Sequence, residues 1–83
     1  MKTEDIMEKI QDVFREVLDD ETLEIREETV PGDIDDWDSL SHVILIVALE
    51  EKFAVKFKIT ELQKLGDVGD MARLVAEKIG KHQ

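Results

Sequence analysis

Cysteine is absent from this sequence and histidine is scarce. The two histidines, His42 and His82, are far apart in the chain. Without cysteine there is no disulfide framework and no thiolate ligand for a metal ion. We therefore expect neither a metal site nor metal-dependent catalysis, and we expect His82 to lie in a frayed C-terminal tail.

Long apolar runs are also missing. The run VILIVAL, residues 43–49, is far shorter than the roughly 20 residues that a membrane-spanning helix needs. The N-terminal segment MKTEDIMEKI lacks the apolar core of a signal peptide. The sequence therefore predicts a cytoplasmic protein that does not insert stably into membranes.

Basic residues are outnumbered, with 11 Lys and Arg against 21 Asp and Glu, so the net charge is −10. This charge repels nucleic acid and favours partners that present basic patches. The 83 residues suffice for one small domain, residues 1–83, with little room for a deep catalytic pocket. We expect a monomeric binding or carrier module rather than an enzyme.

Apolar residues recur at helical spacing in most of the chain. The predicted helices cover residues 4–18, 39–53, a short stretch within 60–66, and 68–79. Thr3 and Asp67 are expected to cap the first and last helices, and Thr60 with Gln63 to form a capping box. The segment AVKFKI before the short helix alternates strictly, so a brief strand is the alternative there. The expected fold is all-α, a four-helix bundle with a long first loop and a short third helix.

The second predicted helix is strongly apolar. Its expected buried stripe consists of Leu40, Val43, Leu45, Ile46, Leu49 and Phe53. Ile44 and Val47 make the apolar arc wider than one core face needs, so they pack in the core or contact a partner. The loop before this helix has ten acidic residues and one basic residue between Asp19 and Asp38. We expect Trp37 to anchor that loop against the bundle.

Ser39 lies at the start of the second helix, and catalysis is the first role to consider. His42, three residues later, is a candidate base. However, a nucleophilic serine needs a sheltered site with oxyanion donors, and no G-x-S-x-G elbow surrounds it. The sequence from Asp33 also does not match an EF-hand calcium-binding loop. Asp38 stands where that loop needs glycine, and Ile44 stands where it needs its final glutamate.

Two other roles for Ser39 remain. Asp38 or Ser39 can cap the helix, which contributes about 1 kcal/mol. Alternatively, Ser39 is a point of covalent attachment. The N–H groups and the positive dipole end of a helix N-terminus stabilise a phosphate, and a hydroxyl modified by another enzyme needs no base of its own.

Several segments together resemble the acyl carrier proteins. They are DSL at residues 38–40, ALEEKF at 48–53 and LGDVGDMARLV at 65–75, with the long acidic loop between the first two helices. The resemblance covers nearly the whole chain. It implies that Ser39 carries 4′-phosphopantetheine, which a phosphopantetheinyl transferase installs from coenzyme A in a magnesium-dependent step. It also implies that Asp38 contacts the transferase and that Leu40 serves both the core and the docking edge.

The same resemblance implies that the protein catalyses nothing. It would carry acyl groups as thioesters and present them to acyl-loading and acyl-transfer enzymes of fatty-acid, polyketide or related biosynthesis. The expected docking residues are Glu50 and Glu51, which would meet basic patches, with Ile44 and Val47 as an apolar contact and His42 as an exposed contact to the phosphate or the transferase.

Some positions depart from the carriers of fatty-acid synthesis. Ser41 and Ile44 occupy places where those proteins have additional acidic residues, so the surface near Ser39 is less acidic. This difference favours a specialised carrier, for example in secondary metabolism or in modification of a surface polysaccharide or lipid. The alternatives are a peptidyl or aminoacyl carrier and a small acidic adaptor without a prosthetic group.

Overall fold

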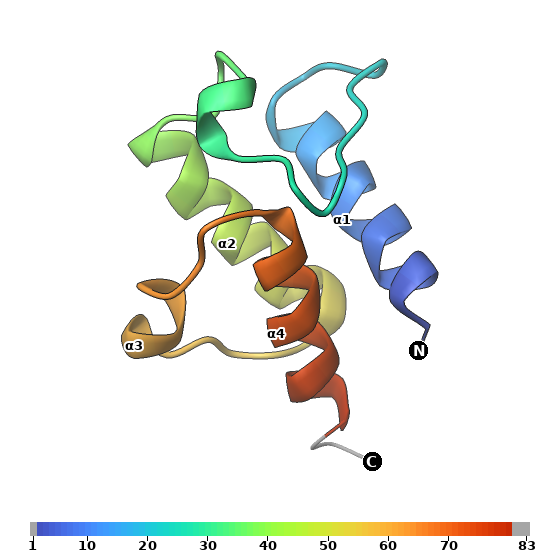
Figure 1. Cartoon of the computed structure of the whole chain (residues 1–83), viewed down its shortest axis with the longest axis vertical. Helices are drawn as coiled ribbons and strands as arrows, with labels where there is room; N and C mark the ends of the chain where they lie inside the picture. The colour runs from blue at the N-terminus through green and yellow to red at the C-terminus, as the bar shows by residue number, and fades with distance from the viewer. Residues whose placement is uncertain (1, 81–83) are drawn as a thin grey trace.

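The computed structural model describes residues 2–80, so the expectation for His82 lies outside the described residues. The elements in chain order are α1 (Thr3–Val17), the 3-10 helix η1 (Pro31–Asp33), α2 (Ser39–Phe53), α3 (Ile59–Leu62) and α4 (Val68–Gly80) (Figure 1). Within residues 2–80 there is no strand, and residues 55–58 form an irregular connection. The all-α fold with a long first loop and a short third helix is confirmed. None of the helices in this part of the chain is long and apolar enough to cross a membrane.

The helix α1 forms one side of the bundle and packs against both α2 and α4. It runs antiparallel to them, and the long loop returns across one end of the bundle (Figure 1). The core is apolar, with no buried polar or charged residue among those described. Its fully buried large side chains are Ile6, Ile10, Phe14, Leu45, Leu49, Val68 and Val75.

The buried face of α2 is narrower than predicted. Leu45, Ile46 and Leu49 are buried as expected, and Phe53 packs at the edge of the core. Leu40 and Val43 were wrongly assigned to the core, because their side chains are 73% and 60% exposed. At about 100° per residue they lie on the opposite side of the helix from Leu45 and Leu49.

The predicted helix caps are partly wrong. Lys2, not Thr3, is the N-cap of α1, and no side chain caps that end. The helix α3 begins at Ile59, and the Lys58 N–H donates to the Glu61 carboxylate at 2.8 Å, so Thr60 and Gln63 do not form the expected box. Glu61 is held in addition by Lys78 of α4, with 2.8 Å between Nζ and Oε1. This ion pair fixes the short helix against α4.

The long loop between α1 and α2 is tied to the start of α4. The Val68 N–H donates to the Thr29 carbonyl at 2.9 Å, and the Gly69 N–H donates to the Glu27 carbonyl at 2.7 Å. These bonds use N–H groups that have no partner within a helix. A Cβ on residue 69 would lie 3.0 Å from the Glu27 oxygen, a tighter contact than most side chains make, so this close approach favours glycine. The loop is therefore ordered by α4 and helps to define the end of the bundle that bears Ser39.

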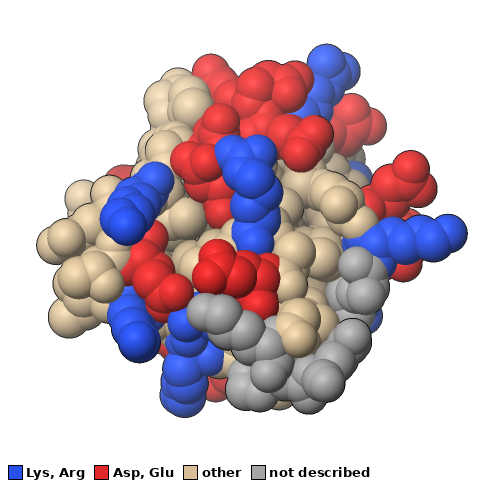
Figure 2. All heavy atoms as spheres, turned by 60° about the horizontal axis from the view of Figure 1, so that its bottom comes forward, with Lys and Arg blue, Asp and Glu red and all other residues tan. Residues whose placement is uncertain are grey.

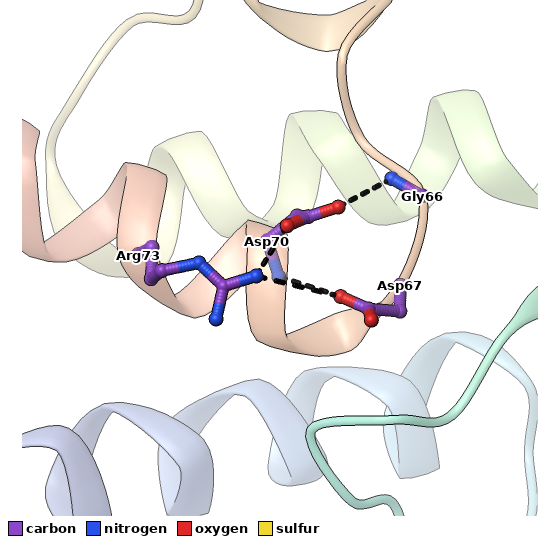
Figure 3. A network of polar contacts seen from close by, with 4 residues as sticks. All are labelled: Gly66, Asp67, Asp70 and Arg73. Carbon is purple, nitrogen blue, oxygen red and sulfur yellow. Dashed lines mark hydrogen bonds and ion pairs between the residues drawn. The ribbon is translucent and has the colours of Figure 1, made fainter.

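A polar network fixes the first turn of α4. The Asp67 carboxylate accepts the Asp70 N–H at 2.9 Å, which confirms Asp67 as the cap. The Asp70 carboxylate accepts the Gly66 N–H at 2.8 Å and also pairs with Arg73 (Figure 3). The Asp70 carboxylate therefore joins the connection before α4, through Gly66, to Arg73 within α4.

We predict that acid weakens the fold partly through this network. The Gly66 N–H, followed by the Arg73 guanidinium, holds the pKa of the Asp70 carboxyl below its ordinary value of 3.8. The stabilisation is therefore complete above pH 3.8 and is lost as the pH falls through the lower pKa of the folded state. Urea unfolding between pH 6 and pH 3 should show this loss, and Asp70→Asn should flatten the curve. The Glu21→Gln variant, which removes one acidic charge from the exposed loop, should leave the slope unchanged; equal flattening by both variants would contradict the assignment.

Candidate functional site

A reciprocal cap fixes the start of α2. The Asp38 carboxylate accepts the Ser41 N–H at 2.9 Å, and the Ser41 hydroxyl accepts the Asp38 N–H at 2.8 Å. The Ser41 hydroxyl also donates to the Asp36 carbonyl at 2.8 Å. The cap is therefore Asp38, supported by Ser41, and not Ser39. Asp38 and Ser41 are three residues apart, which is the spacing of a capping box. This spacing was the signal in the sequence that could have identified Ser41 as part of the cap.

The cap also holds Asp38 in its charged form. The Ser41 N–H and then the Ser41 hydroxyl lower the pKa of the Asp38 carboxyl below its ordinary value. The carboxylate is exposed, directly before Ser39. Asp38 therefore places a negative charge next to Ser39 and sets the direction in which the helix begins.

Ser39 is the first residue of α2 and is exposed to solvent. Its hydroxyl makes no hydrogen bond within the described part of the chain, although Asp38 and Ser41 bond each other across it. The N–H groups of the first turn of a helix lack carbonyl partners within that helix and carry its positive dipole end. The local structure thus presents a free hydroxyl at the N-terminus of α2, beside the backbone N–H groups of its first turn.

Trp37 anchors the loop as predicted. Its side chain is 4% exposed and packs edge-on against Phe14 of α1, with 4.9 Å between the ring centroids. Its indole N–H donates to Nδ1 of His42 at 3.0 Å, and the two ring planes are nearly parallel, 20° apart. Trp37 therefore joins α1, the long loop and α2 just before the candidate site.

The expectation of a freely exposed His42 needs correction. The residue is only partly exposed, and its Nδ1 is used by Trp37. A neutral imidazole that accepts at Nδ1 carries its proton on Nε2. The structure therefore brings His42 to Trp37 as part of the loop anchor, and it does not assemble a Ser39–His42 nucleophile pair.

Glu50 and Glu51, the two predicted acidic docking residues, differ in their surroundings. The Glu50 carboxylate accepts the Phe57 N–H at 2.8 Å and so fixes the connection after α2, whereas Glu51 is exposed. Both lie within residues 50–83, where acidic and basic residues are nearly equal in number. Residues 1–49 carry 15 acidic and 4 basic residues, a net −11, and residues 50–83 carry 6 acidic and 7 basic residues, a net +1.

Figure 2 shows Lys and Arg side chains intermixed with Asp and Glu on the end of the molecule that is turned forward from the bottom of Figure 1. That end includes α3 and the connection leading to it, as their position in Figure 1 shows. The acidity of the chain is therefore concentrated before residue 50. Glu50 and Glu51 line the same groove as Lys56 and Lys78, so they do not belong to one uniformly acidic surface.

An exposed apolar stripe follows Ser39 along α2. Its members are Leu40, Val43, Ile44 and Val47, which are 73%, 60%, 48% and 48% exposed. The spacing i, i+3, i+4, i+7 places these four side chains on one face of the helix. From Ser39 to Leu49 the helix contains no charged residue. The predicted partner residues Ile44 and Val47 are thus outside the core, and Leu40 and Val43 join them.

An open groove of about 480 Å³ lies at the far end of α2. Its lining combines the apolar side chains of Val47, Ala54 and Val55 with charged residues that include Glu50 and Lys78. The groove begins where the apolar stripe ends, because Val47 belongs to both.

Comparison with known proteins agrees with this geometry. Residues 8–75 match the family model described as a phosphopantetheine attachment site. An acyl carrier protein of Thermotoga maritima is 31% identical over 93% of this chain and 95% of its own length. One from Clostridium acetobutylicum is 36% identical over 84% of this chain and 91% of its own. The solution structure of a holo acyl carrier protein from Geobacter metallireducens matches with a TM-score of 0.87 and 45% identity, over 93% of this chain and 88% of that one.

The four-helix fold and the matched residues define a carrier domain to which phosphopantetheine is covalently attached. The chain belongs to the acyl carrier protein family. Proteins of this family are carriers rather than catalysts.

Proposed function

We propose that Ser39 is the attachment residue and that the protein carries acyl groups on a phosphopantetheine arm. The observation that supports this most directly is the free, exposed hydroxyl of Ser39 at the first position of α2. The only other serine, Ser41, uses its hydroxyl in three hydrogen bonds of the cap. A modifying enzyme can therefore reach Ser39 without breaking the local structure.

The residues around Ser39 fit a phosphodiester. The N–H groups of the first turn favour an anion at this end of α2. Because Asp38 is charged and lies directly before Ser39, the phosphate should remain in solvent and not fold back on the cap. Asp38 would contact the transferase, and the exposed Leu40 would lie beside the attached group. When bound, the arm supplies a thiol on which acyl groups are held as thioesters.

The partners follow from this role. A phosphopantetheinyl transferase would transfer the phosphopantetheinyl group of coenzyme A to the Ser39 oxygen. This step breaks the pyrophosphate bond of coenzyme A and releases adenosine 3′,5′-bisphosphate and the hydroxyl proton. Acyl-loading and acyl-transfer enzymes of fatty-acid or polyketide synthesis would use the attached arm. The net −11 of residues 1–49 would attract enzymes with basic patches at long range. Glu51, which is exposed, is the better candidate for such a contact; Glu50 already binds the Phe57 N–H.

Intact-mass spectrometry tests the proposed function. Purified protein is incubated with coenzyme A, magnesium and a broad-specificity phosphopantetheinyl transferase. We expect a gain of one phosphopantetheinyl group, and peptide mapping should locate it on Ser39. Acyl-coenzyme A ligases and aminoacyl-adenylating enzymes then test which cargo the new thiol accepts. No mass gain with several transferases, or a group found on another residue, would refute the proposal.

A further inference from the structure

A lysine-rich segment links the end of α2 to α3. Residues 52–64, KFAVKFKITELQK, contain four lysines and one glutamate, a net +3, so the other 70 residues carry a net −13. The four lysines are exposed; they are Lys52, Lys56, Lys58 and Lys64. Within residues 2–80 none of them forms an ion pair, and the glutamate, Glu61, is paired with Lys78. The segment therefore presents positive charge that no ion pair in this part of the chain neutralises.

The exposed side chain of Ile59 lies in the middle of this segment. Ile59 is the first residue of α3 and is 74% exposed, the largest exposed fraction among the described large apolar side chains. Lys58 directly precedes it, whereas the apolar neighbours Val55 and Phe57 are buried and half-buried. A single exposed apolar residue is ordinary by itself. Here, however, lysines stand on both sides of it in the sequence, so the segment combines an apolar contact with positive charge.

The composition of the segment favours a lipid surface over a protein partner. Lysine is depleted from protein–protein interfaces, where arginine and aromatic side chains are enriched. The segment contains no arginine, and its two aromatic residues, Phe53 and Phe57, are half-buried. Clusters of four or more basic residues are instead typical of segments that bind anionic lipid. Lysine stems can lie along the apolar boundary of a membrane while their ammonium groups reach the headgroups.

The acidity of the rest of the chain does not prevent such a contact. Most of the long acidic loop lies at the opposite end of the molecule from α3 (Figure 1), and the molecule measures 35 Å along its longest axis. At physiological salt, exposed charges separated by more than about 8 Å are largely screened from one another. The carboxylates at the end that includes α3 are intermixed with Lys and Arg (Figure 2). A membrane at that end would therefore be influenced mainly by the nearby lysines.

We propose that residues 52–64 bind the surface of an anionic lipid membrane, with the four lysines on the headgroups and Ile59 at the boundary with the acyl chains. The contact is peripheral and reversible, because one apolar side chain and a few charges are a weak anchor. Ser39 lies at the other end of α2, about 21 Å along the helix axis from Phe53. It therefore stays accessible to enzymes in the bound protein, and the contact requires neither Ser39 nor an attached arm.

Co-sedimentation with lipid vesicles tests this proposal. The full-length protein is mixed with vesicles of equal parts phosphatidylglycerol and phosphatidylcholine, or with vesicles of phosphatidylcholine alone. Each mixture is prepared in about 50 mM and in about 300 mM NaCl. We expect binding to the anionic vesicles only, and we expect the higher salt concentration to weaken it strongly because salt screens the attraction.

Variants then assign the binding to the segment. One lysine near an anionic surface strengthens binding about fivefold, so Lys56→Gln, Lys58→Gln should lower the partition coefficient about 25-fold. The matched control, Lys9→Gln, Arg26→Gln, removes two positive charges from α1 and the long loop and should change partitioning less than about twofold. The Ile59→Gln variant keeps every charge and should lower partitioning about tenfold. Circular dichroism should show that all variants are folded.

Several results would overturn the proposal. They are the absence of binding to anionic vesicles at low salt, an equal loss of partitioning in the control variant, and equal binding to neutral vesicles. Polyglutamate serves as the probe for an acidic protein partner. Binding of polyglutamate that depends on Lys56 and Lys58, without binding to vesicles, would overturn the proposal in favour of such a partner.

The Ser39→Ala variant separates this proposal from the proposed attachment. It should bind anionic vesicles as the wild type does, because Ser39 lies outside the segment. A loss of binding in this variant would contradict the proposal. Failure of the attachment itself is distinguishable, since the wild type would then gain no mass from coenzyme A but would still bind the vesicles.

Discussion

The Ser39→Ala variant is expected to gain no mass from coenzyme A under conditions that modify the wild-type protein completely. The physical reason is that the substitution removes the only free serine hydroxyl at the start of α2. Because the Ser39 side chain makes no hydrogen bond within the described residues and is exposed, the fold should tolerate the change. We expect the free energy of unfolding to stay within about 0.5 kcal/mol of the wild type. Intact mass and urea unfolding measure the two quantities.

The neighbouring serine provides the matched control. The Ser41→Ala variant keeps the Ser39 hydroxyl but loses the bonds to the Asp38 N–H and the Asp36 carbonyl. The Asp38 carboxylate still accepts the N–H of residue 41. Each lost hydrogen bond costs about 0.5–1.5 kcal/mol, so this variant should be less stable but still modified. The two serines should therefore separate attachment from structure. Mass gain by Ser39→Ala, or complete loss of modification in a folded Ser41→Ala protein, would contradict the assignment.

Local sequence signals were sufficient for the helices. The predicted range of α2, residues 39–53, equals the observed one, and α1 is displaced by one residue at each end. Both helices have strong apolar periodicity, and α2 has a capping residue before it. The short α3 begins one residue before the predicted stretch because Glu61, bonded to the Lys58 N–H and to Lys78, determines where it begins.

Which residues of α2 are buried could not be predicted from the sequence in the same way. Apolar residues occur all round this helix, so periodicity alone does not say which of them face α1. That choice depends on long-range packing, which buries Leu45 and Leu49 and leaves Leu40 and Val43 outside. The candidate site, too, could be predicted from the sequence only in part. The tripeptide at residues 38–40 indicated Ser39, but only the geometry shows that Ser41 supports the cap and that His42 bonds Trp37.

These findings connect the charge distribution with the site. Fifteen of the 21 acidic residues occur before residue 50, whereas the first eleven positions of α2, 39–49, are uncharged.

Replacing Trp37 with alanine is expected to have the largest effect on stability. The indole is 4% exposed and contacts both Phe14 and His42, so its loss leaves a cavity between α1, the loop and α2. Truncation of such a buried aromatic side chain costs about 3–5 kcal/mol. A domain of this size has a total stability of about 4–12 kcal/mol, so the variant should lose at least about a quarter of it, and its melting temperature should fall by more than about 10 °C. Thermal unfolding followed by circular dichroism at 222 nm measures the loss.

The Trp37→Phe variant separates packing from hydrogen bonding. Phenylalanine keeps an aromatic ring against Phe14 but cannot donate to Nδ1 of His42. The missing hydrogen bond should lower the free energy of unfolding by about 1 kcal/mol, and the smaller ring should add a packing cost. The converse variant, His42→Phe, leaves the buried indole N–H without its acceptor, which costs about 1–3 kcal/mol.

If Trp37→Ala were within 1 kcal/mol of the wild type, Trp37 would not anchor the loop. Because Asp38 follows Trp37 directly, a loosened anchor should also let the cap and Ser39 move, and modification should slow in proportion to the loss of folded protein.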